Sequence, residues 1–173
     1  VLHARRRSGS HGRRRRVHAT VGRVNDRPPL ARLFAIAYRS LIDELHVRLR
    51  ERGYDDVRPA YGFVLLAARD GATASEVASL MGVTKQAASK LVDAMSASGY
   101  VHRVVDGDDA RRRPLALSAR GHALLATVEA IYAELEAEWA AVIGAKQVER
   151  LRADLVEALA APDGTLPPVR PTW

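Results

Sequence analysis

Three consecutive arginines, Arg111, Arg112 and Arg113, follow the run Asp106-Gly107-Asp108-Asp109. Aspartate and glycine favour tight turns, so this run predicts a hairpin with the arginines at its tip. Guanidinium groups on such a tip can enter a narrow minor groove of DNA or contact its phosphates. The alternative is a charged hairpin whose only effect is to keep an edge strand from aggregating.

A second set of polar side chains precedes the hairpin on one predicted helix. It consists of Thr84, Lys85, Gln86, Ser89 and Lys90. Gln86 and Ser89 can meet base edges in a major groove, and Lys90 can reach a guanine or a phosphate. Thr84 and Lys85, at the start of the helix, suit phosphate contact. These residue types also fit an ordinary solvated helix face, and it is their place before the hairpin that favours DNA contact.

Other kinds of chemistry find no support in the sequence. The six histidines share no metal-ligand spacing, the carboxylates are scattered, and there is no nucleophile motif or glycine-rich phosphate loop. The chain has no cysteine, which excludes disulfides and thiol chemistry. We therefore expect no enzymatic activity, no cofactor and no metal site.

Two short helices around a tight turn must position the polar helix face. The first is predicted to begin with a capping box between Thr73 and Glu76 and to end at Gly82. Thr84 is predicted to cap the second helix, which Gly99 ends. The inward face of this second helix is predicted to hold Ala87, Ala88, Leu91, Val92 and Met95. The spacing of small residues around Gly82 is that of a helix-turn-helix.

Short apolar runs on both sides of the turn predict the two strands of the hairpin. The first run holds Tyr100, Val101, Val104 and Val105, and the second alternates Leu115 with Leu117 before Ser118. Ala72 and Thr73 are predicted to lie beside the hairpin as a brief further strand. Pro114 lacks an amide donor and is expected to shorten the hairpin. A helix-turn-helix with such a hairpin is a winged helix, here predicted at about 59–118.

This winged helix resembles that of the MarR family of bacterial transcription regulators. The resemblance is carried by residues 81–93, MGVTKQAASKLVD, and by residues 109–118, DARRRPLALS, followed by Gly121. The family's hairpin runs Asp-x-Arg-x-x-x-Leu-x-Leu-Thr-x-x-Gly. Ser118 therefore stands in place of threonine, and Pro114 is a departure. In the order and length of its helices the resemblance covers roughly Leu30 to Ala160.

The resemblance implies roles that the residue types alone do not give. It assigns Arg111 to the minor groove, with Asp109 holding its guanidinium, while Arg103, Arg112 and Arg113 are left for phosphates. It also implies a pocket for a small aromatic or lipophilic ligand between the dimer helices and the winged lobe. The candidate lining residues are Phe34, Tyr38, Tyr61, Phe63 and Tyr132. Aromatic residues of this kind more often belong to the core, which is the alternative for each of them.

Amphipathic helices flank the winged helix at about 29–52 and 119–161. Pro28-Pro29 opens the first of them and Gly53 ends it, and Pro59 is predicted to begin the helix that follows. Gly144 divides the last helical stretch, and Pro162 is predicted to terminate it. The winged helix is too small to cover these apolar stripes, so we expect them to be the dimerisation helices of a homodimer. The predicted fold is mainly α with a small β-wing.

The net charge of +7 is concentrated in the first residues of the chain. Residues 1–27 hold nine arginines and one aspartate, so that the rest of the chain has a net charge of −1. We expect 1–27 to be a disordered basic tail and 162–173, with four prolines, a loose C-terminal tail. The basic tail is either a solvated extension, or upstream codons included by a misplaced start, or an arm that adds sequence-independent affinity for DNA.

These observations predict a sequence-specific regulator that binds double-stranded DNA at an inverted repeat. We expect a cytoplasmic homodimer that acts as a repressor and has a small-molecule effector. The sequence contains no run of about 18 apolar residues, so it predicts no membrane span. The alternative is a winged helix that serves as a protein-interaction module without specific DNA binding, which would not need three arginines at its tip.

Overall fold

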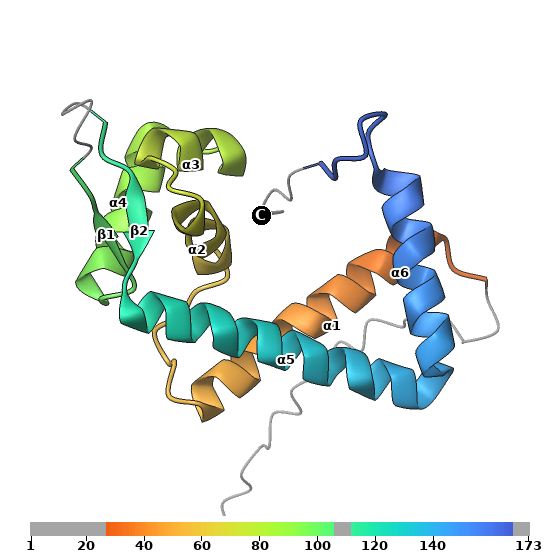
Figure 1. Ribbon diagram of the computed structural model, residues 1–173. Helices are drawn as coiled ribbons and strands as arrows, with labels where there is room; N and C mark the ends of the chain where they lie inside the picture. The colour runs from red at the N-terminus through yellow and green to blue at the C-terminus, as the bar shows by residue number, and fades with distance from the viewer. Residues whose placement is uncertain (1–26, 106–111, 168–173) are drawn as a thin grey trace, which may run out of the picture.

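The structure, a computed structural model, describes residues 27–105 and 112–167 of the chain. These residues form helices and one two-stranded antiparallel sheet, which confirms the predicted fold class (Figure 1). The elements are α1 (Leu30–Glu51), α2 (Tyr61–Arg69), α3 (Ala74–Met81), α4 (Lys85–Ala97), β1 (Val101–Arg103), β2 (Leu115–Leu117), α5 (Ala119–Ile143) and α6 (Ala145–Leu159).

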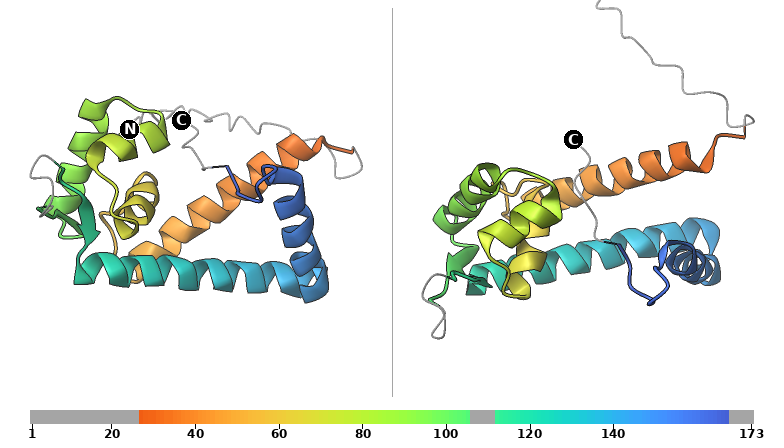
Figure 2. Two further views of the ribbon diagram at one scale, coloured as in Figure 1. Left: turned by 45° about the horizontal axis from the view of Figure 1, so that its top comes forward. Right: turned by 90° about the horizontal axis from the view of Figure 1, so that it is seen from above.

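Helix α5 is the long axis on which the other parts are arranged. A lobe made of α2, α3, α4 and the sheet lies at its N-terminal end, and α6 turns back from its C-terminal end (Figure 1). Helix α1 crosses α5 near the lobe and diverges from it toward its own N-terminus (Figure 2, right). The N-terminal half of α1 therefore extends away from the lobe.

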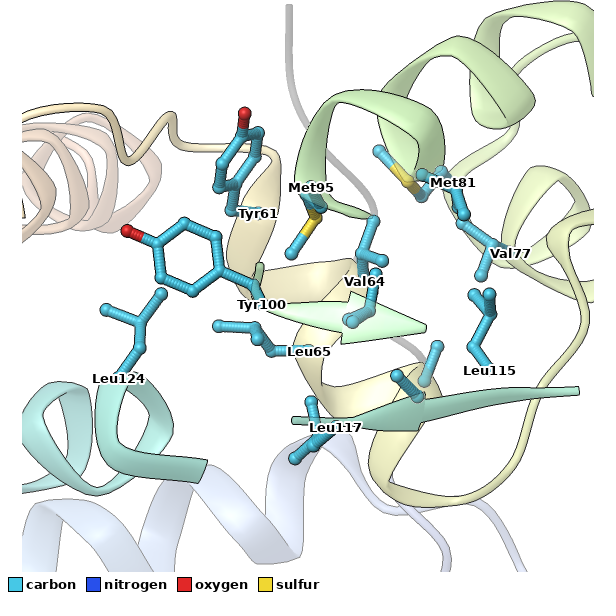
Figure 3. Packing of buried hydrophobic residues seen from close by; sticks show 14 of the residues in the cluster. Tyr61, Val64, Leu65, Val77, Met81, Met95, Tyr100, Leu115, Leu117 and Leu124 are labelled. Carbon is cyan, nitrogen blue, oxygen red and sulfur yellow. The ribbon is translucent and has the colours of Figure 1, made fainter. Parts of the chain in front are cut away.

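The core lies within the lobe and continues between α1 and α5. Val64, Val77, Met95 and Tyr100 are fully buried where α2, α3, α4 and the sheet meet (Figure 3). Val92 of α4 is also fully buried in this cluster. Between the two long helices the buried residues are Leu45, Leu49, Leu124, Ile131 and Leu135. Ion pairs reinforce this crossing, with Arg48 lying 2.6 Å from Glu138 and Arg52 lying 2.6 Å from Glu134.

Local sequence signals set the ends of the helices in the lobe. The capping box is present, because the amide of Thr73 donates to Glu76 Oε2 at 2.6 Å and the amide of Glu76 donates to Thr73 Oγ1 at 3.3 Å. Gly82 ends α3 in the left-handed conformation at φ 67°. The hydroxyl of Thr84 accepts from the amide of Ala87 at the start of α4. These predictions are confirmed.

Other boundaries differ from the predicted ones. Helix α2 begins at Tyr61 instead of Pro59, because residues 59–60 form a turn in which the Tyr61 amide donates to the carbonyl of Arg58. Helix α6 ends at Leu159, before Pro162. Ala87 is exposed, contrary to its predicted inward place, because it lies in the first turn of α4 on the same side as Lys90.

Strand β1 is shorter than predicted. It ends at Arg103, so that Val104 and Val105 lie outside it and are exposed. Beyond the pair of Arg103 and Leu115, Val104 lies opposite Pro114. The carbonyl of Pro114 accepts a hydrogen bond from the Val104 amide, but Pro114 has no N–H to donate in return. Pro114 therefore shortens the ladder, as predicted.

The sheet is attached to the start of α3. Thr73 forms an isolated antiparallel bridge with Pro114, and the amide of Leu115 donates to the carbonyl of Ala72 at 2.9 Å. This is the predicted brief strand beside the hairpin. It holds the base of the wing against the helix-turn-helix.

Candidate nucleic-acid interface

The N-terminal half of α4 presents the predicted polar face to solvent. Lys85, Gln86 and Lys90 are exposed, Thr84 is the cap, and Ser89 is half-buried. The side chains of Lys85, Gln86 and Lys90 make no ion pair or hydrogen bond within the described residues. These side chains are therefore available to an external partner.

The opposite side of α4 fixes how this polar face is presented. Ala88, Val92 and Met95 are completely buried against α2 and α3. The helix ends where Gly99 adopts φ 75° and the amide of Tyr100 donates to the carbonyl of Met95 at 2.9 Å. Packing on one side and caps at both ends hold α4 in one orientation.

The wing lies beside α4 and is joined to it by an ion pair. Arg103 of β1 donates to Asp93 of α4 at 2.7 Å. Arg103, predicted to contact phosphates, is thus paired within the lobe, with about a third of its side chain still exposed. Asp93 was not among the predicted site residues, because no sequence pattern links this position of α4 to β1.

The arginines near the hairpin tip are only partly described. Arg112 and Arg113 are exposed. The hydrogen bond from the Thr73 amide is the main cause that lowers the pKa of Glu76, and the charge of Arg112 makes a small further contribution. Asp109 and Arg111 lie outside the described residues. The roles assigned to these two residues remain predictions.

A second feature is an apolar cavity of about 560 Å³ between α1, α2 and α5. Of the predicted lining residues, the structure brings together Tyr38, Phe63 and Tyr132. Phe34 lies on the exposed N-terminal half of α1, and Tyr61 is buried with its ring edge-to-face against Tyr100. Burial raises the pKa of Tyr132, and Tyr38 and Glu129 add to this effect.

Several other residues that line the cavity were not singled out in the sequence. Ile42, His46 and Leu49 follow Tyr38 at helical spacing on α1, and Gly62 leaves open space on α2. The helical periodicity from Tyr38 onward is the signal that could have found the α1 residues. At His46, the imidazole Nδ1 lies 3.0 Å from the Ile42 carbonyl, while Nε2 is buried without a partner within the described residues.

The described residues show neither a metal cluster nor a membrane span. No group of three or more His, Asp or Glu side chains among them is placed to hold a metal ion. None of the described helices combines the length and hydropathy needed to cross a bilayer.

A helix-turn-helix with a hairpin fixed beside it defines a winged-helix protein. Residues 63–112, which contain α3, α4 and β1 but end before β2, match the model of the MarR family. The resemblance seen in the sequence is thereby confirmed, since over these residues the chain is similar to the MarR family.

Solved structures of the same fold cover about three quarters of the chain. They include the reduced form of MarR from E. coli, at 23% identity over 78% of this chain and 99% of that chain, with a TM-score of 0.65. An S. aureus MepR–DNA complex matches at 21% identity over 76% and 96% of the two chains, with a TM-score of 0.57. S. aureus MepR bound to ethidium bromide matches at 21% identity over 76% and 95%, with a TM-score of 0.54. No curated protein sequence matches the chain.

Proposed function

We propose that the protein is a transcriptional regulator that binds specific double-stranded DNA sequences and has no enzymatic activity. The observation that carries this proposal is the exposed polar half of α4, where Lys85, Gln86 and Lys90 have no partner within the part of the chain that the structure describes, on a helix anchored in the lobe. A helix of this kind fits the major groove, where its side chains can distinguish all four base pairs. The DNA complex of S. aureus MepR supports the proposal by analogy of fold.

The wing adds sequence-independent contacts in this proposal. Arg112 and Arg113 contact phosphates beside the helix-turn-helix, and Arg111 enters the minor groove with Asp109 as its support. Arg103 contributes its positive charge near the phosphates while Asp93 holds its side chain. Contacts of this kind raise affinity for every DNA sequence and make binding sensitive to salt.

The regulator acts as a homodimer on an inverted repeat. Leu30, Phe34 and Tyr38 on the free half of α1 are exposed, as are Val142 and Leu159 near the far end of the molecule. No residue of α6 is buried. A second copy would cover these apolar side chains and would place two recognition helices about one helical turn of DNA, roughly 34 Å, apart.

A small lipophilic or aromatic ligand in the cavity between α1, α2 and α5 releases the DNA, so that the protein acts as a repressor. The size of the cavity and its apolar lining around Tyr38, Phe63 and Tyr132 support this part of the proposal. The complex of S. aureus MepR with ethidium bromide supports it by analogy of fold.

Selection of bound duplexes from a random DNA pool tests the function. We expect the selected duplexes to share an inverted repeat whose half-sites are centred about 10 base pairs apart. A pool that shows no enrichment after repeated rounds would contradict sequence-specific binding, and an enriched single half-site would contradict the dimer on DNA.

A further inference from the structure

Three segments far apart in the sequence meet where the winged lobe joins α5. They are the connector between α1 and α2, the turn that leads from α4 into β1, and the first turn of α5. Tyr100 stands at their meeting point, with its ring fully buried between Tyr61 and Leu124 (Figure 3).

The Tyr100 side chain links the other two segments through its hydroxyl. This hydroxyl donates a hydrogen bond to Asp56 Oδ1 of the connector at 2.6 Å. It accepts one from Arg120 Nη2 of α5 at 3.2 Å, and the same nitrogen lies 3.7 Å from Asp56 Oδ1. The guanidinium carbon of Arg120 also lies 4.8 Å from the centre of the Tyr100 ring, which is the distance of a cation–π contact.

The Tyr100 backbone is held as tightly as its side chain. Its carbonyl accepts a hydrogen bond from the Ser118 amide at 3.0 Å, and the Ser118 hydroxyl lies 2.5 Å from the Gly99 carbonyl and 3.1 Å from that of Tyr100. Gly121 of α5 lies so close to this carbonyl that a Cβ at position 121 would overlap it. The start of α5 is therefore pressed against the strand that leads into the wing.

We propose that Asp56, Tyr100 and Arg120 form a joint that fixes the orientation of the winged lobe on α5. Each contact reaches a different segment, so their combined effect is to prevent rotation of the lobe about the short Ser118 link. The three residues are positioning residues, and none of them lies on the exposed face of α4. On the proposed function, which this inference extends, the joint sets the direction in which each half of a dimer presents its recognition helix.

The charge distribution supports a joint of defined geometry. The Tyr100 hydroxyl lowers the pKa of Asp56, with smaller contributions that include the charge of Arg120. Burial raises the pKa of Tyr100, and its hydrogen bond to Asp56 adds to this. At neutral pH the three groups are thus a carboxylate, a neutral phenol and a guanidinium, which is the state that satisfies all the contacts.

Distance measurement between the lobe and α5 tests the joint directly. The chain has no cysteine, so spin labels attach only at introduced sites, for which Ser75→Cys on α3 and Ala130→Cys on α5 are exposed. Doubly labelled chains are diluted with an excess of unlabelled chains, so that distances within one chain dominate whether or not the protein is a dimer. Double electron–electron resonance then gives the distance distribution between α3 and α5.

Three variants are compared with the wild-type chain. Tyr100→Phe removes the linking hydroxyl but keeps the buried ring, and Asp56→Asn removes the acceptor charge. Tyr61→Phe is the matched control, because the Tyr61 ring packs against that of Tyr100. The Tyr61 hydroxyl that this change removes makes no hydrogen bond within the described residues. We expect a broadened or shifted distribution for Tyr100→Phe and Asp56→Asn, and an unchanged one for Tyr61→Phe.

DNA affinity gives a second result that separates the joint from the proposed function. We expect Tyr100→Phe to bind a selected inverted repeat about threefold to tenfold more weakly, because binding must then order a lobe that is no longer fixed. Affinity for a single half-site should stay within about twofold of wild type, because a half-site contacts only one lobe and does not require a fixed orientation between two lobes.

The joint is overturned if Tyr100→Phe and Asp56→Asn keep the wild-type distance distribution, even where their thermal stability falls. That result would make the network a stabilising contact and nothing more. If the wild-type chain shows no specific DNA binding, the proposed function is contradicted. The distance distributions then test the joint independently of DNA binding.

Discussion

Two glycines within helices show how the lobe depends on single residues. Gly121 touches the Tyr100 carbonyl, whereas a Cβ added to Gly62 would meet nothing within 4 Å. Gly121→Ala should therefore destabilise the protein by about 1–3 kcal/mol through forced overlap. Gly62→Ala should leave stability unchanged or raise it by up to about 1 kcal/mol, because alanine favours a helix. Urea denaturation of both variants measures the difference, and equal effects would contradict the close approach of α5.

The charge of Asp56 gives the stability of the protein a predictable dependence on pH. Its pKa lies below the ordinary value of 3.8, mainly because of the hydrogen bond from Tyr100. A depressed pKa means that the folded state favours the carboxylate, so the stabilisation is present above the ordinary pKa and is lost as pH falls through the lowered one.

Asp56→Asn should accordingly be less stable than wild type at neutral pH. The two proteins should converge in acid, below the lowered pKa, where Asp56 is protonated in both folded and unfolded chains. Urea denaturation across this range measures the gap. A gap that stays constant from neutral pH into acid would show that the carboxylate charge contributes nothing.

At the scale of elements, the local signals in the sequence predict more than the contacts between elements. The capping box of α3, the cap of α4 and the glycines after α3 and α4 follow from residues only a few positions apart, and all are present. The start of α2 and the length of β1 are less well predicted, because a turn and one missing amide donor decide them.

Contacts between distant segments could not be predicted from these patterns. Asp56 and Tyr100 are 44 positions apart, and Arg103, which is predicted to contact phosphates, pairs with Asp93. Periodicity identifies the buried face of each helix, but it does not tell which side chains of other elements that face meets. The same limit explains why Tyr61 and Phe34 lie away from the cavity although they are aromatic, as Tyr38 is.

The cavity between α1, α2 and α5 can be filled from within to test its role. Gly62 lines it and has open space before it, so Gly62→Leu places a side chain where a ligand would lie. If ligand occupancy releases DNA, Gly62→Leu should weaken operator binding and should respond less to added lipophilic compounds than wild type does. Gly62→Ala is the control for the loss of glycine. Wild-type operator affinity in Gly62→Leu would argue against release through this cavity.

For the whole molecule, the exposed apolar side chains of α1, α5 and α6 are expected to be covered by a second copy of the chain. Val142 is 84% exposed, so replacing it with glutamate removes no packing within one chain. Val142→Glu should keep the stability of the isolated chain but place a charge in the proposed dimer interface, where an unpaired charge is costly. Ser75→Glu, on the exposed surface of α3, is the control because it also adds one negative charge.

Sedimentation equilibrium distinguishes these outcomes. We expect wild type and Ser75→Glu to be dimers at micromolar concentration and Val142→Glu to dissociate. A wild-type chain that sediments as a monomer would refute the dimer. An unchanged Val142→Glu dimer would show that the copies meet elsewhere.

Helix α4 is proposed to read the DNA sequence, and Gln86→Ala tests this role most directly. Binding isotherms are measured for wild type, Gln86→Ala and the control Gln147→Ala on α6, each with a selected inverted repeat and with a scrambled duplex. We expect Gln86→Ala to lose about 1–3 kcal/mol on the selected repeat and little on the scrambled duplex, because Gln86 is proposed to meet a base edge in the major groove. Gln147→Ala should match wild type on both. Equal weakening on both duplexes, or no weakening on either, would contradict the placement of α4 as the element that reads the DNA sequence.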